Sequence, residues 1–328
     1  MACRFLGSSR RLPAVLAALS MVVAPACRGE QAPAAGAPFR MADGHPDLRG
    51  VWNFSSVTPL ERPADVTDKA VVSNEEAPEF QRRLLERRNS DRRSADPVAD
   101  LTPAYNEFWK DNGTTLRTNR TSLIVDPPDG RLPPLTEEGK RLAGVAAERA
   151  GLPGGPEDEP LPLRCLIGLN SGPPMFPIDY NNNVALFQTR DHLVILNEMV
   201  HNARIVPLDG RPHDNIRQWV GDSRGRWEDD TLVIDTIHFK GSRNFRGGSA
   251  DMHLIERFRR ESADRLTYTF TIEDPAVWTR PWTVELPMAR TTDPIYEYAC
   301  HEGNMAMANT LAGARFEETM MAAASKKP

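Results

Sequence analysis

The sequence predicts a mainly β protein, an antiparallel up-and-down meander that closes into a barrel, with a long irregular and helical insertion and a C-terminal helix. Proline accounts for 28 of the 328 residues, and because proline breaks helix interiors, a helical bundle is excluded. Short β-branched and aromatic runs alternate with short polar turns over residues 181–300. A meander of that length exposes its edge strands unless it closes, which favours a barrel.

Residues 1–26 are expected to be an export signal and not part of the fold. Three arginines precede an apolar run that ends in small residues before Cys27, and the run is too short to span a membrane. Two alternatives stay open, namely plain cleavage or a lipoprotein signal in which Cys27 is acylated. Either one places the protein in the periplasm or outside the cell, and residues 27–45 then form a flexible tether.

The net charge of the chain limits the kinds of partner that we expect it to bind. The signal takes three arginines from the 40 basic residues, which leaves 37 against 45 acidic residues and a net charge of −8. That balance argues against nucleic acid and limits membrane contact to the N-terminal lipid anchor, so the expected partner is a small molecule. The oligomeric state is open. Cys165 and Cys300 are the cysteines of the folded part, and an oxidising compartment predicts a disulfide between them, with a free thiol as the alternative.

A single β-barrel domain is expected over residues 46–310, with a C-terminal helix or tail over 311–328. After a first strand near Trp52, residues 55–180 form an inserted layer with 11 of the 28 prolines between 127 and 177. We expect this layer to cover or shape one end of the barrel. Helices are predicted at 75–93, 136–150 and 304–323. Meander strands are predicted at 184–189, 192–200, 203–208, 216–220, 231–239, 252–260, 265–273, 281–288 and 294–300.

Several stretches of the sequence resemble stretches found in other proteins. They are Pro46-Asp47-Leu48-Arg49-Gly50-Val51-Trp52, the run from Arg120 to Gly130, the run from Gly225 to Ile234, Glu273-Asp274-Pro275 with Trp278 to Trp282, and the run from Glu297 to Asn304. Gly50-Val51-Trp52 is similar to the G-x-W start of lipocalin-like barrels. Together the phrases resemble a large group of mostly uncharacterised secreted bacterial proteins with a lipocalin-like β-barrel. The resemblance implies the fold and no particular activity.

No familiar catalytic or cofactor signature occurs. The sequence lacks G-x-S-x-G, H-E-x-x-H, G-x-x-x-x-G-K-[ST] and G-x-G-x-x-G, so we expect no cofactor and no metal site. Glu198, His201 and Arg204 cluster at a junction between two predicted strands. If Glu198 points inward, burial disfavours its charged form and makes it a candidate acid or base, with His201 and Arg204 as catalytic partners. The alternative is an exposed turn or a structural ion pair.

Small-molecule sites combine aromatic walls with a few polar anchors. Candidate ligand-binding residues of this kind are Tyr180, Trp219, His238, Arg257, Tyr268, Trp282 and Glu297, and plain core packing or solvent exposure is the alternative for each. The leading hypothesis is a barrel that binds a small, partly apolar molecule. The alternatives are an acid–base enzyme of the isomerase, hydratase or lyase type on the same barrel, and a structural envelope protein with a filled barrel.

Overall fold

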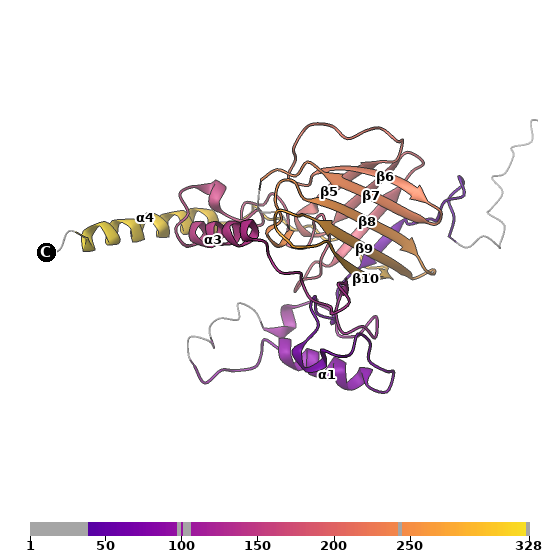
Figure 1. Cartoon of the computed structure of the whole chain (residues 1–328), viewed down its shortest axis with the longest axis horizontal. Coiled ribbons are helices and arrows are strands. Elements are labelled where there is room, and N and C mark those ends of the chain that lie inside the picture. The colour runs from indigo at the N-terminus through magenta and orange to yellow at the C-terminus, as the bar shows by residue number, and fades with distance from the viewer. Residues whose placement is uncertain (1–38, 97–99, 101–105, 242–244, 326–328) are drawn as a thin grey trace, which may run out of the picture. The chain divides into compact units, whose positions relative to one another are not determined.

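The computed structural model describes residues 39–96, 100, 106–241 and 245–325 (Figure 1). The predicted signal, most of the tether and Cys27 lie outside this part. Ten strands form one sheet: β1 (Gly50–Asn53), β2 (Ile124–Asp126), β3 (Asn183–Gln188), β4 (His192–Asn197), β5 (Ala203–Pro207), β6 (Asp222–Glu228), β7 (Thr231–Ile237), β8 (His253–Arg260), β9 (Arg265–Glu273) and β10 (Trp282–Thr291).

All strand pairs in this sheet are antiparallel, and the strand order is β5-β4-β3-β1-β10-β9-β8-β7-β6, with β2 beside β10. The inner face follows the alternation of the sequence. On β9, Leu266, Tyr268, Phe270 and Ile272 are fully buried while the threonines between them are half-buried. Such alternation is typical of an antiparallel strand with one face on the core.

The sheet is not closed into a barrel. In the described part of the chain β5 and β6 end the sheet, and no hydrogen-bonded register joins them. Side chains meet across this seam instead: Arg204 Nη1 lies 3.3 Å from Ser223 Oγ, and a Cβ added to Gly225 would lie 2.4 Å from Leu208 Cδ2. The predicted meander is therefore confirmed as a mainly β antiparallel sheet, but its backbone closure is not.

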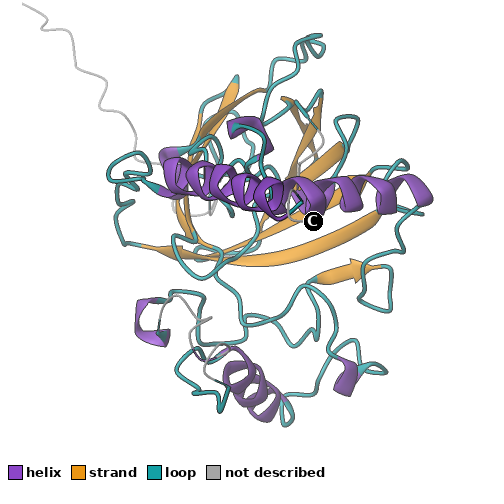
Figure 2. Cartoon of the chain, turned by 90° about the vertical axis from the view of Figure 1, so that its left-hand side faces the viewer, coloured by secondary structure: helices purple, strands orange, loops and turns teal. Residues whose placement is uncertain are grey.

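Three α-helices and five 3-10 turns complete the described part of the fold (Figure 2). The α-helices are α1 (Ala77–Arg88), α3 (Glu137–Gly151) and α4 (Ala306–Ala324). The 3-10 turns are η1 (Ala64–Val66), η2 (Glu107–Trp109), η3 (Pro156–Asp158), η4 (Met199–His201) and η5 (Phe245–Gly247). The α3 helix begins at a Thr136 cap, whose Oγ1 accepts a hydrogen bond from Gly139 N at 2.9 Å. Among the described helices, none has the length and apolar run needed to cross a membrane.

Two predicted strands are wrong. Residues 216–220 form a loop, with only an isolated bridge from Gln218 to Phe239. The strand in this region is β6. Its charged residues and its glycine, which an edge strand tolerates, do not give the apolar alternation from which strands were predicted. Residues 294–300 run as irregular chain after β10. Asp293 precedes this stretch and Pro294 begins it, and because proline cannot donate to the ladder, the strand that β10 would otherwise extend is interrupted.

Candidate functional site

The interior of the sheet is filled by side chains. Trp52, Phe258, Tyr268, Phe270 and Trp282 are each fully buried, and their neighbouring rings pack with centroids 4.9 to 6.0 Å apart. Tyr268 and Trp282, predicted to line a ligand site, are therefore core residues. The Trp282 Nε1 donor has no hydrogen-bond partner among the described residues.

Arg204 belongs to a buried polar triad within this core. Its guanidinium pairs with both carboxylate oxygens of Glu256, the Nη2–Oε1 distance being 2.8 Å. The Tyr268 hydroxyl donates to Glu256 Oε1 at 2.7 Å and accepts from Met175 N at 3.1 Å. Burial acts against the Arg204 charge, yet the Glu256 carboxylate overcomes it and raises the pKa of Arg204. Burial also raises the pKa of Tyr268 well above its usual range.

This triad is a sealed structural element. Arg204 is 5 % exposed, Glu256 and Tyr268 are fully buried, and Met175, which caps the tyrosine hydroxyl, is fully buried as well. The three groups satisfy one another's hydrogen-bonding capacity and hold β5, β8 and β9 together.

Glu198 and His201 lie at η4, apart from that triad. Glu198 is buried and accepts from Asn183 Nδ2 at 2.9 Å and from Tyr296 N at 3.2 Å. His201 is exposed, and its Nδ1 accepts from Tyr298 N at 3.2 Å. The His201 N–H donates to the Glu198 backbone carbonyl at 3.3 Å, but among the described residues no side-chain hydrogen bond joins Glu198, His201 and Arg204, so the predicted catalytic side chains are not brought together. Glu198 and His201 bind the chain that follows β10, whereas Arg204 belongs to the interior of the sheet.

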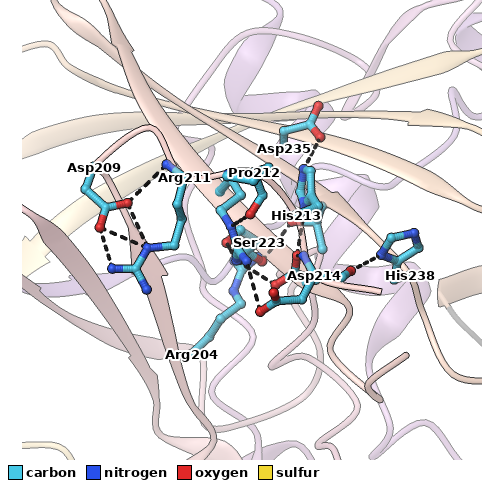
Figure 3. A network of polar contacts seen from close by, with 12 residues as sticks. Arg204, Asp209, Arg211, Pro212, His213, Asp214, Ser223, Asp235 and His238 are labelled. Carbon is cyan, nitrogen blue, oxygen red and sulfur yellow. Dashed lines mark hydrogen bonds and ion pairs between the residues drawn. The ribbon is translucent and has the colours of Figure 1, made fainter. Parts of the chain in front are cut away.

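The outer face of strands β6 to β9 carries a row of alternating acids and histidines. His213 lies 2.9 Å from both Asp222 and Asp235, and His253 lies 2.7 Å from Asp235 and 2.9 Å from Glu273. Figure 3 shows His213 beside Asp235 in this row. Because carboxylates only accept hydrogen bonds, a doubly protonated ring satisfies both contacts of His253.

The row fixes the loop before β6. Asp214 N donates to Asp222 Oδ2 at 2.9 Å, and the Asp214 carbonyl lies 2.5 Å from Nδ1 of the predicted ligand residue His238 (Figure 3). Further along the loop, Gln218 exchanges backbone hydrogen bonds with residues 238 and 240. The loop that carries Trp219 is thus held against the end of β7. In the described part of the chain, no three His, Cys, Asp or Glu side chains are grouped to hold a metal ion.

A cavity of about 360 Å³ lies between the Pro-rich layer and the end of the sheet. Residues from the stretch 160–178 form one wall of the cavity. The rest of its lining comes from Trp219, Phe239, Phe245 and Arg246. Phe245 connects this cavity to the core, since its ring lies 5.7 Å from Phe270 and 6.2 Å from Trp282. The lining is therefore apolar and aromatic, and Arg246 is its one charged side chain among the described residues.

Cations approach the aromatic rings of this cavity. The Trp219 ring has the Arg164 guanidinium 5.3 Å and the Lys240 ammonium 5.0 Å from its centroid. The Arg246 guanidinium lies 5.4 Å from the centroid of Phe176 and 5.9 Å from that of Phe245. Aromatic faces attract such cations, so the rings hold the three positive charges around the cavity.

The predicted disulfide is confirmed, and it anchors the cavity wall. Cys165 and Cys300 are bonded, with their Cα atoms 5.7 Å apart. Cys165 lies within the wall stretch, and Asn304 Nδ2 adds a hydrogen bond to Leu163 O at 3.3 Å. The wall is therefore tied to the chain that follows β10.

Of the predicted ligand-binding residues, Trp219 lines this cavity. Tyr180 is half-buried and accepts at its carbonyl from Asn170 Nδ2, Arg257 is half-buried on the outer side of β8, and Glu297 is exposed. Sequence reasoning missed Phe176, Phe245, Arg246 and Arg164. The proline cluster located the layer that forms the wall, but nothing in the pattern indicated which of its side chains face inward.

Comparisons with protein-family models, curated proteins and solved structures found no match. The resemblance to secreted lipocalin-like proteins therefore stays a prediction.

Proposed function

We propose that this chain binds a small, partly apolar molecule in the cavity between residues 160–178 and the end of the sheet. The observation that carries the proposal is the lining: among the described residues, the walls are aromatic and aliphatic and Arg246 is the single charged side chain. Small-molecule sites have this composition, and a volume of about 360 Å³ falls within their usual range.

The walls are fixed before any ligand arrives, which favours binding. Prolines restrict the backbone of the wall stretch, the Cys165–Cys300 disulfide anchors it, and the acid–histidine row holds the opposite loop with Trp219. A preformed cavity loses little conformational entropy when it is occupied.

The proposal also includes the resemblance to lipocalin-like barrels and the export of the protein from the cytoplasm. Ligand sites form at the mouths of β-barrels, and the cavity adjoins one end of a sheet whose edge strands approach each other. A disulfide persists in an oxidising compartment, so the Cys165–Cys300 bond supports a location outside the cytoplasm. Substitution of Cys27 by alanine, followed by membrane fractionation, separates a lipid-anchored protein from a freely secreted one.

The binding test uses phenylnaphthylamine, a neutral probe that fluoresces in apolar surroundings. Trp219→Ala removes one wall and is expected to weaken binding about tenfold, which corresponds to about 1.4 kcal/mol. Trp109→Ala is the matched control, because Trp109 is 64 % exposed on η2 and does not line the cavity. An absence of binding to the wild-type protein, or equal loss in both variants, overturns the proposal and leaves the filled-barrel structural protein.

A further inference from the structure

We infer that the molecule bound in this cavity is an anion with a planar apolar part, and that Arg246 holds its negative group. The inference rests on the proposed function and adds the charge of the ligand. It follows from the distribution of charge around the cavity, the pairing of the cations and the orientation of Arg246.

The charge around the cavity is positive on a protein that is acidic as a whole. As far as the structure describes the chain, the lining includes Arg246 and no aspartate or glutamate, whereas the complete chain has a net charge of −5. Arg164 and Lys240 approach the same cavity through Trp219. A pocket with cations and no acids stabilises a negative group and disfavours a positive one.

The three cations at the cavity have no ion-pair partner among the described carboxylates. Other basic residues of this half of the chain, such as Arg217, Arg224 and Arg226, each form an ion pair with an aspartate or glutamate. The Arg246 guanidinium instead lies against the rings of Phe176 and Phe245. Within the described part of the chain, no carboxylate neutralises the Arg246 charge at the cavity.

The orientation of Arg246 suits a carboxylate or sulfonate. Its guanidinium lies over the Phe176 ring, and a guanidinium stacked on an aromatic face keeps its N–H edge available for paired hydrogen bonds to an anionic group. Arg246 also lines a second cavity of about 580 Å³, so it is reached from two sides. The described lining of that second cavity mixes two acids, Glu61 and Asp179, with Arg87 and Arg88, whereas the described lining of the first cavity has Arg246 and no acid.

A planar apolar part follows from the rings that form the walls. Trp219, Phe239, Phe245 and Phe176 line the cavity, and aromatic side chains pack favourably against flat ring systems. A flat aromatic carboxylate or sulfonate therefore satisfies both the walls and the charge.

The test compares two fluorescent probes that share a ring system. Anilinonaphthalene sulfonate carries a sulfonate that neutral phenylnaphthylamine lacks. We expect the wild-type protein to bind the sulfonate at least about tenfold more tightly, a preference that falls as salt is added. Arg246→Gln should abolish the preference by weakening binding of the sulfonate more than binding of the neutral probe, while Arg246→Lys should retain part of the preference.

Arg259→Gln is the matched control, since Arg259 is exposed on β8 and away from the cavity lining. Near-ultraviolet circular dichroism shows that each variant is folded. Equal affinity for both probes overturns the anion inference while the proposed function stands. A preference that survives in Arg246→Gln overturns the role of Arg246, and failure of both probes to bind overturns the proposed function itself.

Discussion

His253 Nε2 lies 2.7 Å from Asp235 Oδ2, between the neighbouring strands β8 and β7. The hydrogen bond to Asp235 raises the pKa of His253, against burial, which lowers it. The same contact lowers the pKa of Asp235. Since the folded state holds the His253 proton more tightly, this stabilisation is complete below the unfolded pKa of about 6.5 and is lost as the pH rises through the raised folded value.

His253→Gln should therefore destabilise the protein in a pH-dependent way. We expect a loss of about 0.5 to 1 kcal/mol in the free energy of unfolding at about pH 5.5 and a smaller loss at about pH 9. Asp235 acts in the opposite sense, because its stabilisation is complete above about pH 3.9 and is lost as the pH falls through its lowered folded pKa. Urea unfolding at several pH values measures both. His192→Gln is the control, since its ring forms no hydrogen bond among the described residues, and an equal loss at both pH values would contradict the prediction.

The buried triad predicts strong coupling between Arg204 and Glu256. Glu256→Gln leaves the guanidinium without its counter-charge, and we expect a loss of about 3 kcal/mol or more. The double variant Arg204→Met with Glu256→Gln should lose less than the sum of the two single variants. A double-mutant cycle from urea unfolding measures this coupling. Simple additivity would show that the two charges do not stabilise each other.

Loss of the disulfide should affect both stability and the cavity. Cys165 and Cys300 are separated by 135 residues, and removal of a native disulfide commonly costs about 2 to 5 kcal/mol. We expect the double substitution to serine to lower the thermal midpoint and to weaken binding of phenylnaphthylamine, because the wall stretch loses its anchor. Intact mass with and without reductant checks the bond in the wild-type protein. Unchanged binding would mean that the prolines alone hold the wall.

The seam between β5 and β6 predicts an unusual requirement for glycine. A Cβ on Gly225 would lie 2.4 Å from Leu208 Cδ2 and 3.1 Å from Val206 Cγ1. Gly225→Val should therefore destabilise the protein by about 1 to 3 kcal/mol through overpacking. Leu208→Ala in the same chain should recover part of the loss. Thermal unfolding of the three variants tests whether the edges are in contact, and a neutral effect of Gly225→Val would show that they separate.

Much of the sheet could be predicted because alternation is local. The threonines of β9 and the buried residues between them fix its inner face without reference to the rest of the chain. The disulfide could be predicted from two cysteines and a compartment. The edge strand β6 could not, because its charged residues find partners in the loop before it, and those partners appear only after folding.

The candidate site was predicted less well for a related reason. Tyr268 and Trp282 have the residue types of a ligand site, yet they pack against strands far away in sequence and fill the interior. Phe245 and Arg246 come from a short turn with no periodic pattern. Their role depends on the proline layer being placed opposite them, which is a property of tertiary structure.

The position of β1 has a consequence for how the chain is made. This strand pairs with β3 on one side and with β10 on the other, so Trp52 lies opposite both Val184 and Arg290. The centre of the sheet therefore depends on contacts between sequence-distant segments, which makes folding slow. We expect the central part of the sheet to form only after residues 282–291 have been synthesised, because β1 has no partner on one side until β10 exists.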